Sequence, residues 1–125
     1  RHEVLAMGSS RVYGLDADAL ETSYGLPYIP VPLGAGSVYK TFTAATALEK
    51  GLGINYQLSV PPSGYASPIY VDGGGRPLPV QNSGDYAERL SITDALAQSP
   101  NTAFVKLMEF TGVPDVVDMA VRLGM

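Results

Sequence analysis

The sequence predicts an α+β fold that is mostly helical, with one or two short strands. The firmest element is a helix over 37–50, where apolar side chains recur at helical spacing and Gly51 follows as a typical C-terminal residue. Further helices are expected over 93–98, 102–110 and 114–123, and a glycine closes each of the last two. Short apolar runs bounded by turn residues supply the strands.

The strand candidates are the apolar runs 3–7, 56–60 and 68–71. Each run is short and is bounded by glycine, proline or serine, the pattern that is typical of strand ends. A short helical stretch is also expected over 16–21. The three glycines at 73–75 predict a hairpin tip rather than a phosphate loop, because no Gly-Lys-Ser/Thr follows them.

Composition narrows the classes of function. The chain has 125 residues, of which 46% are hydrophobic and 16% charged, and this suits one ordinary globular domain. Its net charge is −4 and no basic patch is visible, so no nucleic-acid partner is expected. There is no cysteine and only one histidine, His2, so no metal site, no cofactor and no histidine-based serine triad are expected.

Ser37 and Lys40 form the first candidate catalytic pair. Residues three apart on a helix lie on one face with Cβ atoms about 5–6 Å apart, so the amine of Lys40 can reach the hydroxyl of Ser37. A hydroxyl is a weak nucleophile until a base takes its proton, and a lysine is such a base when burial keeps it neutral. The alternative is that Ser37 only caps a helix, because Ser-x-x-Lys is frequent by chance.

Ser99-Pro100-Asn101 is the second chemical signal, and it separates two of the predicted helices. A tight turn there aims both polar side chains outward, where a hydroxyl can pass on a proton and an amide can both donate and accept. Serine and asparagine before a helix are also common caps, so this motif alone leaves a capping role open.

Together the two motifs closely resemble the transpeptidase domain of penicillin-binding proteins. The resemblance rests on 36–43 (GSVYKTFT) and 96–104 (LAQSPNTAF), which carry the Ser-x-x-Lys and Ser-x-Asn elements of that family. It extends over nearly the whole chain, with 3–7 similar to the second core strand, and it is nearest to the bifunctional class A enzymes. It implies part of the β-lactamase/transpeptidase-like fold, an antiparallel sheet with a helical subdomain.

The resemblance implies a D,D-transpeptidase that cross-links peptidoglycan stem peptides through a serine acyl-enzyme and that penicillin and other β-lactams inhibit. In that scheme Ser37 attacks the D-Ala-D-Ala carbonyl, its backbone N–H forms half of the oxyanion hole, and Lys40 accepts the proton. Ser99 relays a proton to the leaving amine, and Asn101 holds Lys40 and the substrate amide. The resemblance also implies a membrane-anchored parent protein with a glycosyltransferase domain, on the extracytoplasmic face of the bacterial cell membrane.

One family motif is missing from the sequence. Lys40 is followed by Thr41 and Phe42, and no Lys-Thr-Gly stands elsewhere. Residues 1–125 are therefore expected to be a partial transpeptidase domain, an internal fragment without the first core strand and the Lys-Thr-Gly region, which is not acylated efficiently alone. The alternatives are a β-lactamase, a D,D-carboxypeptidase or a β-lactam sensor of the same fold, a catalytically dead binding domain, and an unrelated helical domain with chance motifs.

Overall fold

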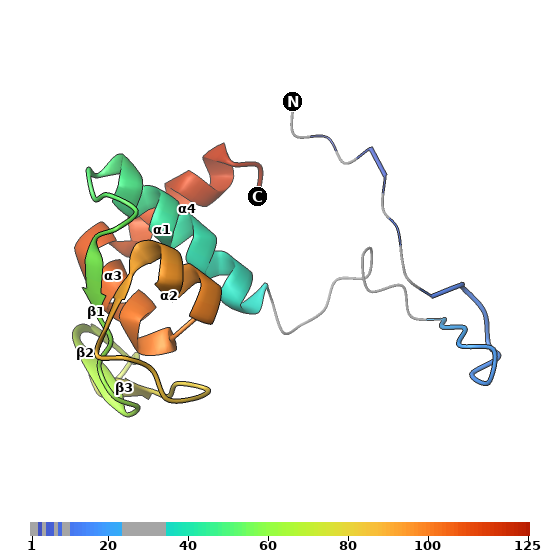
Figure 1. Cartoon of the computed structure of the whole chain (residues 1–125), viewed down its shortest axis with the longest axis horizontal. Helices are drawn as coiled ribbons and strands as arrows, with labels where there is room; N and C mark the ends of the chain where they lie inside the picture. Colours follow the sequence, from blue (N-terminus) through green and yellow to red (C-terminus); the bar gives the residue numbers. More distant parts are fainter. Residues whose placement is uncertain (1–2, 4, 7, 9–10, 24–34) are drawn as a thin grey trace. The chain divides into compact units, whose positions relative to one another are not determined.

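The fold was analysed in a computed structural model. The residues that it describes are 3, 5–6, 8, 11–23 and 35–125. The chain divides into two units, 1–36 and 37–125. Its elements follow in the order η1 (a 3-10 helix, Gly36–Tyr39), α1 (Lys40–Glu49), β1 (Gln57–Ser59), β2 (Tyr65–Val71), β3 (Pro77–Val80), β4 (Arg89–Ser91), α2 (Ile92–Gln98), α3 (Asn101–Thr111) and α4 (Val113–Arg122) (Figure 1).

The described residues of the first unit contain little regular structure. Tyr13 and Thr22 form an isolated parallel bridge. The side chain of Asp16 accepts hydrogen bonds from two of the backbone N–H groups that follow it, and this makes a turn in place of the helix expected over 16–21. Such local bonds compete with helix formation. Three residues of the predicted strand 3–7 are described and belong to no strand, and the other two lie outside the described residues.

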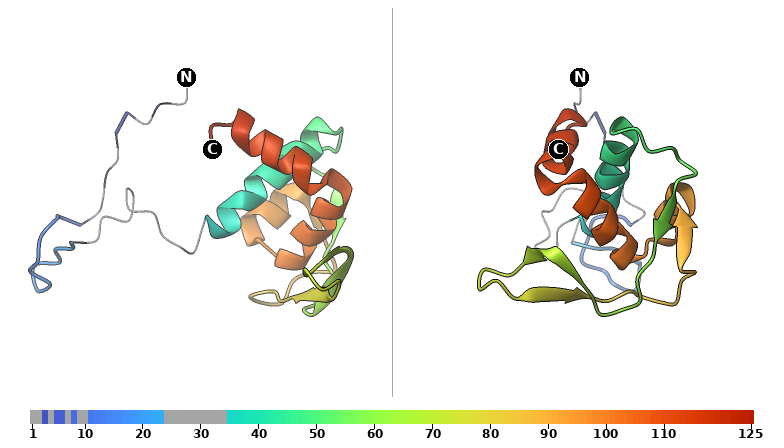
Figure 2. Two further views of the ribbon diagram at one scale, coloured as in Figure 1. Left: turned by 180° about the vertical axis from the view of Figure 1, so that it is seen from behind. Right: turned by 90° about the vertical axis from the view of Figure 1, so that its left-hand side faces the viewer.

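Four α-helices pack together in the second unit, with α1 at their centre. α1 contacts α2, α3 and α4, and Figure 2 shows it enclosed between them. The predicted helices α2, α3 and α4 begin and end within one residue of their expected bounds. The buried residues of α1 are small, so its neighbours can approach it closely. The helices α1, α2 and α3 and the strands β1 and β4 share one apolar core. It consists of Ala44, Ala47, Leu58, Val60, Leu90, Ile92, Ala95, Ala103, Phe104 and Leu107.

The strands form two separate antiparallel pairs. β1 pairs with β4, with Leu58 opposite Leu90, and β2 forms a hairpin with β3. The α+β class is confirmed, but the described residues form four short strands where one or two were expected. The runs expected over 56–60 and 68–71 overlap β1 and β2. β3 was missed because it contains two prolines, which interior strands exclude but an edge strand tolerates.

The β2–β3 hairpin is fastened to α3 by two tyrosines. The hydroxyl of Tyr65 donates to Oε1 of Glu109 at 2.6 Å, and that of Tyr70 donates to the carbonyl oxygen of Met108 at 2.7 Å. At the tip, Asp72 accepts from two backbone N–H groups of the glycine-rich turn, as expected for a hairpin tip. In Figures 1 and 2 this hairpin lies at the end of the unit away from α4.

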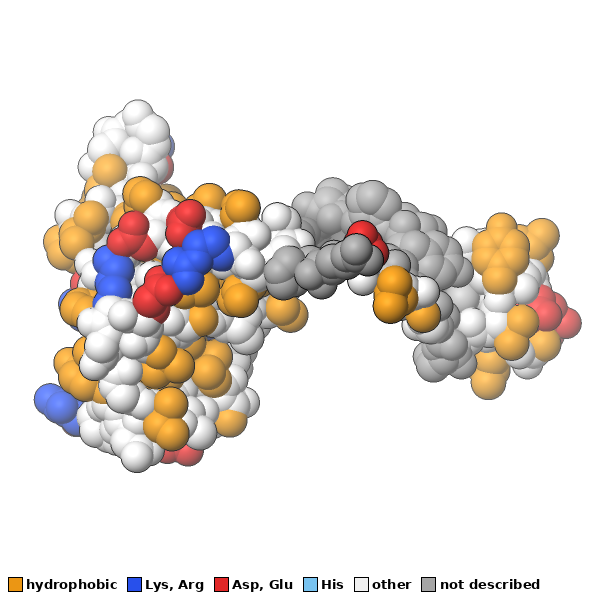
Figure 3. Space-filling view, turned by 90° about the horizontal axis from the view of Figure 1, so that it is seen from above, with side chains coloured by type: hydrophobic (Ala, Val, Ile, Leu, Met, Phe, Trp, Pro, Cys, Tyr) orange, Lys and Arg blue, Asp and Glu red, His pale blue; other side chains and the backbone are white. Residues whose placement is uncertain are grey.

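Opposite charges alternate on the surface of this unit. Ion pairs of 2.5 Å link Lys50 to Asp115 and Glu49 to Arg122, which joins the end of α1 to α4. Figure 3 shows acidic and basic side chains next to one another on one face. Exposed pairs of this kind contribute at most about 1 kcal/mol each to stability. None of the helices in the described part of the chain has the length and apolar character needed to cross a membrane.

Ser91 caps α2, and its removal has a predictable effect on stability. Its Oγ accepts from the N–H of Asp94 at 3.0 Å and donates to Oδ2 of Asp94 at 2.6 Å. We expect Ser91→Ala to lower the free energy of unfolding by about 1 kcal/mol, because the N–H loses its partner. Urea-dependent protease sensitivity of the full-length protein that contains this chain measures the change. Ser59→Ala, at an exposed position of β1, is the matched control, and equal effects of the two variants would contradict the capping role.

Candidate active site

The amine of Lys40 is the point at which the predicted site residues meet. Its Nζ lies 3.2 Å from Oγ of Ser37, 2.8 Å from Oγ of Ser99 and 2.6 Å from Oδ1 of Asn101. The carbonyl oxygen of Ser99 is also 2.7 Å away. The contacts of Lys40 with Ser99 and Asn101 bridge 59 to 61 positions of sequence. The structure thus brings all four predicted residues together, while their chemical roles stay predictions.

Ser37 is positioned by a turn that is tighter than expected. The predicted helix over 37–50 begins as the 3-10 helix η1, and the α-helical part starts only at Lys40. In a 3-10 helix the side chains at i and i+3 eclipse one another, which places the hydroxyl of Ser37 directly beside the amine. Gly36 enters this turn with a φ of +55°, a backbone conformation that glycine adopts without steric cost. Ser37 remains exposed to solvent.

Ser99 is positioned by an unusual backbone conformation at the end of α2. Its φ and ψ of 63° and 40° lie in the left-handed region, and its N–H donates to the carbonyl oxygen of Ala95 at 2.8 Å. A non-glycine residue in this region costs roughly 1–3 kcal/mol unless its surroundings fix it. Pro100 is buried immediately after it. This turn directs both the hydroxyl and the carbonyl oxygen of Ser99 at Lys40.

The amide of Asn101 has its orientation fixed from both sides. Its Nδ2 donates to the backbone carbonyl oxygen of Gln81 at 2.7 Å, and its Oδ1 accepts from Lys40. A carbonyl oxygen only accepts hydrogen bonds, so the NH₂ group must face Gln81 and the oxygen must face the amine. Sequence reasoning missed Gln81, since no local pattern pairs it with a residue 20 positions later.

The surroundings of Lys40 favour its neutral form. Burial lowers the pKa of Lys40 from its ordinary value. Within the described part of the chain no carboxylate lies at ion-pair distance from it. Two of its neighbours, the carbonyl oxygen of Ser99 and Oδ1 of Asn101, can only accept, and a neutral amine has two N–H groups for them. Its lone pair then remains for a serine hydroxyl.

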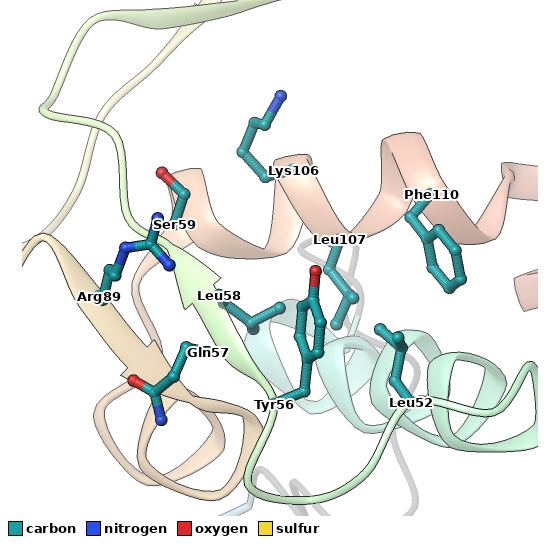
Figure 4. A pocket seen from close by; sticks show the side chains of 9 residues that line it. All are labelled: Leu52, Tyr56, Gln57, Leu58, Ser59, Arg89, Lys106, Leu107 and Phe110. Carbon is teal, nitrogen blue, oxygen red and sulfur yellow. The ribbon is translucent and has the colours of Figure 1, made fainter.

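Among the pockets formed by the described residues, one adjoins two of the four site residues, Lys40 and Asn101. A cavity of about 330 Å³ adjoins Lys40 and is mostly apolar, being lined by Tyr39, Lys40, Thr43, Tyr70, Val80, Asn101, Phe104, Val105 and Met108. A second pocket, of about 260 Å³, lies between β1 and α3 and includes none of the four site residues (Figure 4). The described residues contain no group of three or more His, Cys, Asp or Glu able to hold a metal ion.

Comparison with known proteins identifies the class of protein. The family model described as the penicillin-binding protein transpeptidase domain matches residues 1–125. The chain therefore belongs to this family, and it combines the family's Ser-x-x-Lys and Ser-x-Asn elements around one amine.

Among particular proteins, the chain is similar to penicillin-binding proteins 1A of two mycobacteria. It is 32% identical to the Mycobacterium tuberculosis protein over 107 residues, and this alignment covers 83% of this chain and 12% of the relative. It is 31% identical to the Mycolicibacterium smegmatis protein over 85 residues, and this alignment covers 67% of this chain and 10% of the relative. The solved structure of the penicillin-binding protein PonA1 from M. tuberculosis matches 87% of this chain and 25% of its own, with a TM-score of 0.60 and 30% identity. The expected nearness to class A enzymes is confirmed, and the chain spans only a small part of these relatives.

Proposed function

We propose that the protein containing this chain is a serine D,D-transpeptidase that cross-links peptidoglycan stem peptides. The single observation that carries the proposal is the amine of Lys40, which contacts the hydroxyls of Ser37 and Ser99 and the amide of Asn101 at once. A half-buried lysine beside an exposed serine, with no carboxylate of the described residues at ion-pair distance, is an arrangement suited to nucleophilic catalysis, because burial lowers the pKa of the base next to the hydroxyl that it activates.

The proposed reaction proceeds in two transfers of the acyl group. Oγ of Ser37 attacks the carbonyl carbon of the penultimate D-Ala as Nζ of Lys40 takes the hydroxyl proton. The C–N bond then breaks, and Ser99 relays a proton to the leaving D-Ala amine, which leaves an ester on Ser37. An amine of a second stem peptide attacks this ester, the C–O bond to Ser37 breaks, and the proton that the amine loses returns to Oγ of Ser37, which leaves the new amide as the cross-link. Asn101 orients Lys40 and the substrate amide, and the N–H of Ser37 donates to the developing oxyanion.

The chain is proposed to be a part of a transpeptidase domain. The small share of the relatives that it spans supports this placement. The remaining assignments follow from the family: β-lactams as inhibitors, a membrane-anchored parent with a glycosyltransferase domain, and a position on the extracytoplasmic face of the membrane.

Labelling with a fluorescent penicillin tests the proposal. In the full-length protein we expect one stoichiometric adduct, which mass spectrometry of a proteolytic digest should map to the peptide that contains Ser37. A donor stem peptide with an added amine acceptor should yield a cross-linked product, whereas release of free acid alone would indicate a hydrolase of the same fold. Absence of any adduct in the folded protein would contradict the proposed chemistry.

The isolated chain provides a second prediction. We expect the 125-residue chain alone to show no rapid stoichiometric labelling, because the Lys-Thr-Gly element of the family is not among its residues. The same fluorescent penicillin, followed over time beside the full-length protein, measures this. Labelling of the isolated chain at the rate of the full-length protein would contradict the expectation.

A further inference from the structure

The first turn of α3 receives its cap from a distant residue. Pro100 precedes the helix and its side chain cannot accept a hydrogen bond, so α3 has no cap from its own N-cap residue. Instead Oδ1 of Asn82 accepts from the backbone N–H of Thr102 at 3.0 Å. Thr102 is fully buried, and an unpaired N–H there would carry a desolvation cost of about 1–3 kcal/mol. Asn82 thus replaces the missing cap.

The side-chain nitrogen and the backbone N–H of Asn82 are bound as well. Its Nδ2 donates to Oγ1 of Thr102 at 3.0 Å and to the carbonyl oxygen of Pro61 at 3.4 Å. Thr102 in turn donates from Oγ1 to the same Pro61 oxygen at 2.6 Å, and the N–H of Asn82 donates to Oγ of Ser63 at 2.9 Å. The backbone around Asn82 is therefore fixed against the start of α3 by several independent contacts.

This fixed point adjoins the candidate site. Gln81 directly precedes Asn82, and its carbonyl oxygen accepts from Nδ2 of Asn101 at 2.7 Å. Because that contact orients the Asn101 amide toward Lys40, the Asn82 contacts set the placement of the Lys40–Asn101 hydrogen bond. We infer that Asn82 is a positioning residue for acylation, acting through Gln81 and Asn101. The inference rests on the proposed function.

The contacts of Asn82 predict which kinetic quantity changes. Its side chain binds groups of Thr102 and Pro61, and Asn82 lines a separate cavity with Pro61 and Ser63 rather than the cavity beside Lys40. A substitution there displaces the Asn101 amide without removing a substrate contact. The substitution therefore lowers the limiting rate constant of acylation. The concentration of β-lactam that gives half of the limiting rate should change much less.

The test is the time course of fluorescent-penicillin labelling by the full-length protein over a range of concentrations. We expect Asn82→Ala to lower the limiting rate constant roughly 10-fold to 100-fold, the size typical of a misplaced catalytic group. Asn82→Asp keeps the acceptor for the N–H of Thr102 but loses the donor to Thr102 and Pro61, so it should regain only part of the lost rate. Asn82→Ser, too short to reach both partners, replaces the alanine variant if that variant does not fold.

Two comparisons separate positioning from a general loss of structure. Asn55→Ala removes the same side chain from an exposed turn and should leave the rate unchanged. In the Asn101→Ala background, Asn82→Ala should have little further effect, because members of one hydrogen-bonded network are non-additive. An unchanged rate for Asn82→Ala, or a full additional effect in the Asn101→Ala background, would overturn the inference. Failure of the unsubstituted protein to label would instead contradict the proposed function.

Discussion

Ser37→Ala is expected to abolish covalent labelling of the full-length protein by penicillin, whereas Ser99→Ala is expected to slow labelling and leave the adduct on Ser37. Distance alone does not separate the two serines, since Lys40 lies 3.2 Å from one hydroxyl and 2.8 Å from the other. Their surroundings do. Ser37 is exposed at the N-terminal end of the η1–α1 segment, where backbone N–H groups stabilise developing negative charge. Ser99 is half-buried, and its carbonyl oxygen faces the same amine.

Intact mass and peptide mapping after penicillin treatment distinguish the two roles. Ser59→Ala, at an exposed position of β1 in the same unit, is the matched control and should label like the unsubstituted protein. An adduct that persists in Ser37→Ala and maps to the peptide containing Ser99 would exchange the roles of the two serines. A complete loss of labelling in Ser99→Ala, with the fold intact by circular dichroism, would make Ser99 indispensable rather than a relay.

The helices were predictable because their signals are local. Periodic apolar residues and the stop signals Gly51, Gly112 and Gly124 specify a helix without reference to the rest of the chain. The Ser37–Lys40 contact follows from the same periodicity. The proximity of Ser99 and Asn101 to this pair does not, because nothing local spans some sixty positions. That proximity was expected only from the resemblance to a family in which both motifs serve one site.

The features that sequence reasoning missed depend on tertiary contacts. The left-handed backbone of Ser99 was not predicted, and it occurs where α2, which contacts α1, ends before the buried Pro100. Gln81 and Asn82 directly follow β3, an edge strand that was not predicted because it contains two prolines. Their partners belong to α3, and only the completed hairpin brings them together. The network around the site is therefore less visible in the sequence than the site itself.

Substituting Lys40 separates two ways in which a lysine can serve this site. As a general base it must lose a proton, whereas as a fixed positive charge it must keep one. Burial without a neighbouring carboxylate favours the base, because it lowers the pKa of Lys40. We expect Lys40→Met to lower the acylation rate constant by about 100-fold to 10,000-fold, the usual contribution of a positioned base. Lys40→Arg should be equally impaired, since a guanidinium keeps its charge at any practical pH.

The lowered pKa of Lys40 also predicts how the acylation rate depends on pH. Acylation needs the neutral amine, so its rate should rise with pH as Lys40 loses its proton. The midpoint should lie below the ordinary lysine pKa of about 10.4, since burial lowers the pKa of this amine. The rate constant of penicillin labelling, measured across pH in the full-length protein and in Lys40→Arg, tests both points. A rising limb that survives in Lys40→Arg would assign the titration to another group, and near-normal acylation by that variant would show that the site needs the charge rather than the base.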